Sequence, residues 1–262
     1  MRGGILYYSV TGNTALAVES LANRLPIPFS LVDVTSLPSV DIGVFDVVGF
    51  ASSTDFWGVP RRMSELIERL PVNNSVPAFV INTFGGVSGK TLPRLGSMVS
   101  ARGFDVIAGH SLHMPDSYPP LLALGIRAAG APSEREIARF DAFASQLSSL
   151  ISAVEMGGSI RAERLPVTLV DRLFRAGART AGRDAMGDRY ADAAVCTQCG
   201  TCASDCPAGA IHLDPLPVFD TEICCGCWRC YNRCPVCAIR TGSRLRGEQY
   251  SGPSDQLRAK LP

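Results

Sequence analysis

All ten cysteines of this 262-residue chain lie between Cys196 and Cys237, and the preceding 195 residues contain none. This clustering restricts the fold of that segment more than any other feature of the sequence. A disulfide framework is typical of small secreted domains, but the N-terminal residues lack the long apolar stretch of a signal peptide. Thiols concentrated in one segment of a chain without an expected export signal favour ligation of metal ions or iron–sulfur clusters.

The cysteines belong to an internal repeat with a period of 28 residues. Each half reads C-x2-C-x2-C-x3-C-P, and the repeat defines a compact domain over residues 189–241, here called the cysteine domain. The first half contributes Cys196, Cys199, Cys202, Cys206 and Pro207. These align with Cys224, Cys227, Cys230, Cys234 and Pro235 in the second half.

This spacing is the bacterial signature for cluster binding. Three thiolates at close spacing wrap one cube of iron and sulfide, whereas the fourth, held before a proline, reaches the other cube. The first predicted cluster takes Cys196, Cys199, Cys202 and Cys234, and the second takes Cys224, Cys227, Cys230 and Cys206. Zinc is disfavoured because zinc ribbons do not place four cysteines in eleven residues ahead of a proline.

Over residues 190–241 the chain resembles the bacterial two-cluster ferredoxins, which implies two 4Fe–4S clusters that pass single electrons. Three positions depart from the pattern without changing the predicted ligands. Trp228 stands where the first half has Gly200. Cys225 and Cys237 hold no ligand position; we expect them to be small buried hydrophobes, and a role as alternative ligands or redox sensors stays open.

Residues 1–156 alternate short apolar runs with helical patterns, which indicates a parallel sheet covered on both faces. The predicted strands cover residues 5–8, 29–32, 45–50, 78–82 and the segment beginning at 104–108. The predicted helices cover residues 15–25, 63–70, 92–101 and 133–154, the last opening with a capping box of Ser133 and Glu136. Five such units fit a doubly wound, five-stranded α/β sheet.

The turn after the first predicted strand reads S-V-T-G-N-T, residues 9–14. Small hydroxylated residues and a glycine before a helix place backbone and side-chain donors around one point, which suits a phosphate. We expect a cradle of neutral donors, because the nearest basic residues in the sequence are Arg2 and Arg24. An ordinary polar turn is the alternative interpretation.

The same turn resembles the phosphate loop of flavodoxins, S/T-x-T-G-x-T. The resemblance implies a flavodoxin-like domain that binds FMN where the strand order reverses. It implies that the phosphate is held by Ser9, Thr11, Gly12, Asn13 and Thr14.

Two further loops follow predicted strands and fit the flavin ring by position. The loop after the third strand offers small polar side chains and an aromatic that could stack on the ring: Ser52, Ser53, Thr54, Phe56 and Trp57. The loop after the fourth strand offers glycines that let backbone amides approach the ring: Thr83, Phe84, Gly85, Gly86 and Gly89. Residues 113–118 are expected either to form the rim of the site or to be an exposed turn.

The remaining segments are an Arg-rich linker, residues 157–188, with a short helix expected over 167–176, and a polar tail, residues 242–262, expected to be mobile. The formal net charge of +1 argues against binding of nucleic acid. No apolar run approaches the roughly 20 residues of a membrane-spanning helix. We therefore expect a cytoplasmic protein.

The two halves together resemble flavodoxin–ferredoxin fusion proteins of anaerobic bacteria and archaea: a flavodoxin-like domain, a helical connector and a C-terminal α+β ferredoxin-like domain. The resemblance implies an electron-transfer iron–sulfur flavoprotein that passes electrons between FMN, the two clusters and a redox partner protein. The alternatives are an FMN-dependent reductase of a small molecule held near Trp57 and Tyr118, and a flavin-free domain that only docks the ferredoxin. An electron carrier is favoured over a substrate-specific enzyme, since no Ser/His/Asp or Cys/His catalytic set is apparent.

Overall fold

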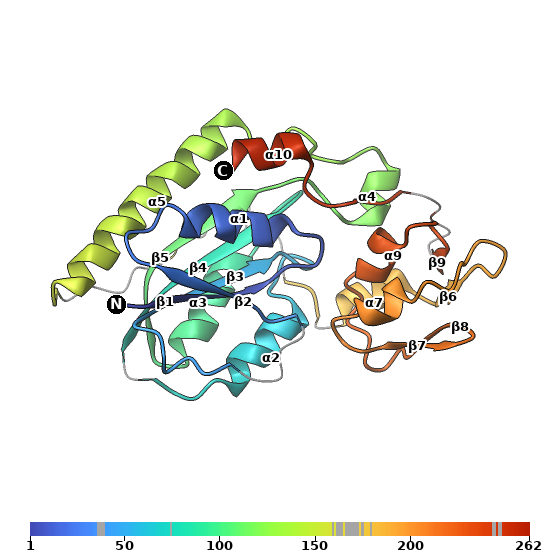
Figure 1. Cartoon of the computed structure of the whole chain (residues 1–262), viewed down its shortest axis with the longest axis horizontal. Coiled ribbons are helices and arrows are strands. Elements are labelled where there is room, and N and C mark those ends of the chain that lie inside the picture. Colours follow the sequence, from blue (N-terminus) through green and yellow to red (C-terminus); the bar gives the residue numbers. More distant parts are fainter. Residues whose placement is uncertain are drawn as a thin grey trace.

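The computed structural model describes residues 1–35, 40–73, 75–158, 160, 165, 173, 176–178, 180–242, 245 and 248–262. Its larger part is a sheet of five parallel strands with helices on both faces (Figure 1). The strands are β1 (Gly3–Tyr8), β2 (Phe29–Asp33), β3 (Val47–Ser53), β4 (Val76–Phe84) and β5 (Phe104–His113). Each predicted strand thus has a counterpart, because apolar runs such as that of β3 are buried on both faces.

Helices pack on both faces of the sheet. On one face lie α1 (Asn13–Ala22) and α5 (Glu134–Glu155), which bury side chains that include Leu16, Leu21, Phe140 and Leu147. On the other lie α2 (Arg61–Arg69) and α3 (Thr91–Ser100), which bury Met63, Ile67, Leu92 and Leu95. The capping box that the sequence predicts at the start of α5 is confirmed, with Ser133 and Glu136 bonding each other's backbone N–H groups.

The strand order is β2-β1-β3-β4-β5. This is the order of flavodoxin-like doubly wound sheets, in which the direction of winding reverses between β1 and β3. The loops that leave the carboxyl ends of β1 and β3 diverge at such a point and leave a crevice between them. The fold therefore places the predicted phosphate loop, residues 9–14, and the loop of residues 52–57 on two sides of one crevice.

The cysteine domain follows α7 (Ala181–Met186) and consists of short elements. Two antiparallel sheets pair β6 (Arg189–Ala191) with β9 (Ile239–Thr241) and β7 (Ile211–Asp214) with β8 (Leu216–Phe219). The helices α8 (Thr201–Ser204) and α9 (Arg229–Arg233) occupy equivalent places in the repeat. The backbone follows the same repeat, because left-handed residues recur at Gln198 and Gly226, at Gly200 and Trp228, and at Gly209 and Cys237.

The C-terminal tail differs from the mobile segment that we expected. Its last helix, α10 (Asp255–Lys260), lies beside α1 and α5 (Figure 1). Leu257 and Leu261 are buried in the same core as Phe140. Lys260 donates hydrogen bonds to the carbonyl oxygens of Gly130 (2.9 Å) and Pro132 (3.0 Å). The tail is therefore a strap that returns from the cysteine domain to the sheet. Most of the helix predicted over 167–176 lies outside the described residues.

Direct contacts join the cysteine domain to the sheet. Arg229 donates to the carbonyl oxygens of Ser9 (3.0 Å) and Val10 (3.1 Å). Asn232 donates to the carbonyl oxygen of Ser117 at 2.9 Å. Because these bonds reach the loops at the carboxyl ends of β1 and β5, the cysteine domain closes the open end of the crevice. Within the described ranges, no helix is long and apolar enough to span a membrane.

Candidate functional site

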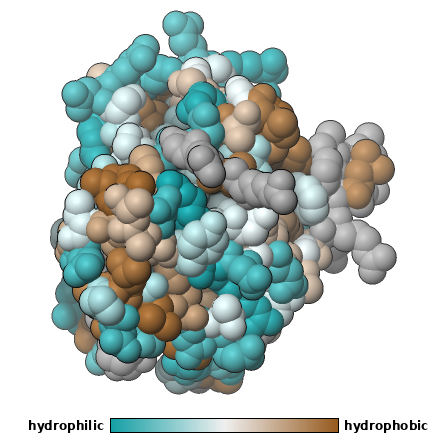
Figure 2. Space-filling model, turned by 90° about the vertical axis from the view of Figure 1, so that its right-hand side faces the viewer, coloured by the Kyte–Doolittle hydropathy of each residue, from teal (hydrophilic) through white to brown (hydrophobic). Residues whose placement is uncertain are grey.

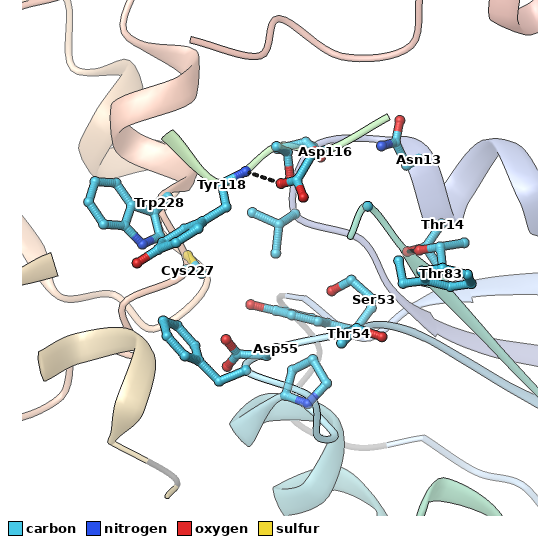
Figure 3. Close-up of a pocket in the computed structure, with 18 of the residues that line it drawn as sticks. Asn13, Thr14, Ser53, Thr54, Asp55, Thr83, Asp116, Tyr118, Cys227 and Trp228 are labelled. Carbon is cyan, nitrogen blue, oxygen red and sulfur yellow. Dashed lines mark hydrogen bonds between the residues drawn. The ribbon is translucent and has the colours of Figure 1, made fainter. Parts of the chain in front are cut away.

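A cavity of about 320 Å³ occupies the crevice, within the usual size range of small-molecule sites (Figure 3). Its walls come from the loops after β1, β3, β4 and β5, from the start of α2, and from residues 225–228 of the cysteine domain. Most of the predicted flavin-binding residues line it: Ser9, Thr11, Asn13, Thr14, Ser53, Thr54, Phe56, Trp57, Thr83, Phe84, Gly85 and Gly86. Their part in FMN binding stays a prediction, but the structure brings them together.

The predicted phosphate loop is held in shape by its own side chains. The Ser9 hydroxyl accepts a hydrogen bond from the N–H of Ala15 (3.1 Å), and the hydroxyls of Thr14 and Thr83 bond each other at 2.9 Å. Asn13 donates to the carbonyl oxygen of Pro115 at 2.9 Å. The N-cap residue of α1 is Gly12, which has no side chain to cap the helix, so the positive end of the helix dipole faces this turn and favours an anion.

An arginine contacts the predicted phosphate loop, which differs from the neutral cradle that we expected. Arg61 and Arg62 line the cavity from the start of α2. Arg229 reaches the phosphate loop from the cysteine domain through its bonds to Ser9 and Val10. Distance along the chain concealed these cations, since none lies within 30 residues of the loop.

The loop after β3 presents two aromatic side chains on a strained turn. Asp55 and Gly58 exchange backbone hydrogen bonds of 3.0 and 2.9 Å, and between them Phe56 (φ 42°) and Trp57 (φ 62°) both have positive φ. A two-residue turn with positive φ at both positions normally contains Asn or Gly. Bulky residues in this conformation are costly, which is a recurrent feature of functional loops. The Phe56 ring contacts that of Tyr118, with 5.6 Å between centroids.

Side chains outside the cavity hold the loop after β4 in place. His113 lies with Nε2 2.7 Å from the carbonyl oxygen of Gly85 and with Nδ1 3.0 Å from the carboxylate of Glu136. Gly85 also packs so closely on Asp116 that a Cβ atom would stand 2.4 Å from its carboxylate oxygen. Glycine is thus required here by space, and the loop is tied to β5 and α5.

Other predicted residues lie behind the cavity wall. The buried Ser52 donates to the carbonyl oxygen of Ser53. Gly12 (φ 101°) forms the turn into α1 and lies against Pro253 of the C-terminal strap. Gly89 (φ 59°) packs against Trp57, where a Cβ atom would be 2.4 Å from the Trp57 Cβ. Of the segment expected at the rim, residues 115–118 line the cavity.

Asp55 and Tyr8 line the cavity and were not among the predicted site residues. Burial raises the pKa of the Asp55 carboxyl from 3.8 to about 6. The pKa of Tyr8 is raised mainly by burial and further by Cys227, Cys225 and Asp55. Tyr8 belongs to the core of the sheet, and both residues interact with Cys225, which is more than 160 residues away in the sequence.

Residues 225–228 also escaped the sequence-based prediction of the cavity. The thiol of Cys225 is hydrogen-bonded to the hydroxyl of Tyr8 and to the thiol of Cys227. Cys227 is a predicted ligand of the second cluster, and both thiols line the cavity. One difference between the two halves of the repeat had indicated that this segment is unusual: Trp228 stands where the first half has Gly200.

Several predicted cluster ligands lie near one another, including cysteines from opposite halves of the repeat. Burial chiefly raises the pKa of Cys202, and nearby Cys234 and Cys196 add to the shift. Burial likewise raises the pKa of Cys230, with nearby Cys224 and Cys206 contributing. A second, much smaller cavity is lined by the predicted ligands of the first cluster, Cys196, Cys199, Cys202 and Cys234.

Backbone N–H groups donate to these sulfurs in a repeated pattern. The N–H of Gln198 bonds Cys196 at 3.4 Å, and in the second half that of Gly226 bonds Cys224 at 3.4 Å. Similarly, the N–H groups of Ala210 and Ala238 bond Cys206 at 3.2 Å and Cys234 at 3.1 Å. Donors aimed at sulfur stabilise thiolates and tune bound clusters, so this backbone fits a cluster ligand set.

Among the described residues, no group of three or more His, Cys, Asp or Glu side chains is arranged to hold a metal ion. In a 4Fe–4S cluster each thiolate binds a different iron atom, so the four sulfurs stand around a cube rather than around one ion. For a cluster site the relevant features are therefore thiols that lie near one another and N–H groups that donate to their sulfurs.

Comparison with protein-family models gives no match, and neither does comparison with curated proteins. Among solved structures, a flavodoxin from the domain Archaea is 12% identical, with 58% of this chain and 99% of that chain aligned at a TM-score of 0.43. A Streptococcus pneumoniae TIGR4 flavodoxin is 16% identical, with 57% of this chain and 99% of that chain aligned at a TM-score of 0.43. The rubredoxin oxygen:oxidoreductase of Desulfovibrio gigas is 16% identical, with 58% of this chain and 36% of that chain aligned at a TM-score of 0.44. The assignment of a flavodoxin-like fold rests on the strand order rather than on these distant likenesses.

Proposed function

We propose that this chain is an electron-transfer iron–sulfur flavoprotein, with FMN in the interdomain cavity and two 4Fe–4S clusters in the ferredoxin-like cysteine domain. When bound, FMN would exchange electrons singly or in pairs, and each cluster would exchange one electron at a time. The protein would therefore connect carriers of one electron with carriers of two.

One observation carries the proposal: Cys227, a predicted ligand of the second cluster, forms part of the wall of the predicted flavin cavity. A flavin in the cavity and a cluster on Cys227 would be separated by little more than this side chain. The contacts of Arg229 and Asn232 with the sheet hold the two domains in this arrangement. Direct transfer between the two groups is the function that such proximity supports best.

The residues present fit FMN. The turn into α1 presents the positive end of the helix dipole and small hydroxylated side chains to a phosphate, and Arg61 and Arg62 supply positive charge to the same cavity. The aromatic rings of Phe56 and Tyr118 line another part of the cavity and suit a flat ring system. A cavity with an anion site and an aromatic part matches a phosphate joined to a heteroaromatic ring.

The first predicted cluster would be the exchange point for a redox partner protein. Its ligand Cys199 is exposed, whereas the cavity-lining Cys225 is buried and Cys227 is half-buried. Exposed apolar side chains belong to the same domain: Tyr190, Val195, Leu213, Val218 and Ile223. From the side of the cysteine domain, Figure 2 shows hydrophobic patches among hydrophilic residues, a surface suited to transient contact.

A second candidate is an FMN-dependent reductase of a small molecule, with the clusters as its electron source. The observation in its favour is Asp55, a half-buried residue in the cavity wall whose carboxyl pKa of about 6 suits a proton donor near neutral pH. A reductase would need such a group beside the flavin.

Purification without oxygen, followed by analysis of FMN, iron and sulfide, tests the proposal. We expect about one FMN and about eight iron and eight sulfide per chain. A flavin that is reoxidised rapidly by ferredoxin-type acceptors supports the relay. One that reacts rapidly only with a single metabolite supports the reductase. A chain that takes up no FMN after reconstitution contradicts both.

A further inference from the structure

The C-terminal strap crosses the predicted phosphate loop between two anchored ends. At the cysteine-domain end, Gln249 donates hydrogen bonds to the carbonyl oxygens of Tyr231 (2.5 Å) and Cys234 (3.1 Å). At the other end, α10 is fixed in the core of the sheet by the buried Leu257. The stretch between these anchors, residues 250–253, runs from the cysteine domain toward α10 (Figure 1).

Residues 250–253 pack on the turn that leads into α1. A Cβ atom on Gly252 would stand 3.2 Å from the carbonyl oxygen of Thr11. Similarly, a Cβ atom on Gly12 would stand 2.9 Å from the ring of Pro253. The strap therefore contacts the same turn that supplies Thr11 to the wall of the cavity.

One side chain of the strap holds a cavity-lining residue directly. The Tyr250 hydroxyl donates to Oδ1 of Asn13 at 2.5 Å, and Nδ2 of Asn13 donates to the carbonyl oxygen of Pro115 at 2.9 Å. Burial raises the pKa of Tyr250 to about 12, so its hydroxyl keeps the proton that it donates. The backbone N–H of Tyr250 is itself fixed, because it donates to Oδ1 of Asn232 at 3.0 Å. Both polar ends of the Asn13 amide are thus tied, one of them by the strap.

Asn13 is the first residue of α1, so its anchored side chain fixes the start of the helix whose positive end favours an anion. The preceding residue, Gly12, has no side chain that could do this. Figure 3 shows Asn13 on the far side of the cavity from Trp228. Without the Tyr250 hydroxyl, the Asn13 amide would lose one of its two anchors, and binding of an anion would carry the cost of ordering this turn.

We propose that Tyr250 is a positioning residue of the phosphate site, which holds Asn13 so that the turn is preorganised for the phosphate of FMN. This inference rests on the proposed function. The residues that line the cavity do not include Tyr250, so it acts through Asn13 rather than by touching FMN. The effect should fall on the phosphate and spare the flavin ring, because the ring is assigned to the loops after β3 and β4.

The test compares the affinities of FMN and riboflavin, which differ only in the phosphate, for cluster-loaded full chains from which flavin has been removed. Quenching of flavin fluorescence measures both. Y250F removes the hydroxyl and keeps the ring, and N13A removes the acceptor of that hydroxyl. S254A is the matched control for a loosened strap: it removes the cap of α10, where the Ser254 hydroxyl accepts from the N–H of Leu257 at 3.2 Å, and leaves Tyr250 in place.

We expect Y250F to raise the dissociation constant of FMN about fivefold and that of riboflavin by less than about twofold. S254A should leave the ratio of the two dissociation constants within about twofold of wild type. In the N13A background, Y250F should have no further effect, because the contact through which it acts is gone. Unchanged affinity of Y250F for FMN, equal weakening of FMN and riboflavin, or further weakening by Y250F in the N13A background overturns the inference.

The wild-type chain decides separately on the proposed function. If wild type binds FMN while Y250F gives one of the contradicting results, the proposed function survives without the inference. If wild type binds neither flavin, the proposed function itself fails, and the inference fails with it.

Discussion

Replacement of Asp55 by asparagine should stabilise the protein, and by an amount that depends on pH. Burial in the cavity wall raises the pKa of this carboxyl from 3.8 to about 6. The folded chain therefore holds the proton more tightly than the unfolded chain, and ionisation opposes folding. At roughly 1.4 kcal/mol for each pKa unit, the ionised carboxyl costs about 3 kcal/mol of stability.

The sign of the pH dependence follows from the same shift. Below the unfolded pKa of 3.8 the carboxyl is protonated in both states and D55N gains nothing from the loss of charge. Between that value and about pH 6 the wild type loses stability as pH rises, and above it the full cost remains. The advantage of D55N should thus be about 3 kcal/mol at about pH 7 and roughly half as large at about pH 5.

Denaturant unfolding of both full chains, followed by tryptophan fluorescence across this pH range, measures the difference, since other titrating groups contribute equally to both. D214N is the control, because Asp214 is an exposed acid in the cysteine domain. Its stability should stay within about 0.5 kcal/mol of wild type at every pH. An advantage of D55N that is constant with pH, or that shrinks as pH rises, refutes the reasoning.

Further substitutions test the strap, the ligand set and the loop beside the cavity. L257A should lower the free energy of unfolding by about 2–5 kcal/mol, because Leu257 is buried in the core under α1 and α5; a loss below about 1 kcal/mol would mean that the strap is not packed as described. C224S should lower the iron content by about half while C225S leaves it unchanged, as elemental analysis would show; equal losses would contradict the ligand set. G89A should destabilise the chain by about 2 kcal/mol more than G125A in denaturant unfolding, since both glycines have positive φ but only a Cβ at Gly89 meets a neighbour within 4 Å.

The sheet and the phosphate loop were predictable because their signals are local. A continuous apolar run such as that of β3 is buried on both faces wherever it lies in a parallel sheet. The turn of residues 9–14 carries its donors within six consecutive positions. The thiol spacing is local in the same sense, and the ligand assignment drawn from it stays a prediction.

The rest of the site was hidden because it depends on docking between distant segments. Asp55 reads as an ordinary loop acid until the cysteine domain closes over it. Arg229 is more than 200 residues from the loop that it bonds. The strap escaped detection because a six-residue helix with buried Leu257 and a neighbouring Leu261 is too short to show periodicity.

The most direct measurement of the central claim is an anaerobic reductive titration of the purified chain with a low-potential reductant. The account predicts about four electrons per chain, two for FMN and one for each cluster, with flavin and cluster absorbance both changing. Uptake of about two electrons with flavin bleaching alone, or no uptake by a chain that contains zinc, would contradict it.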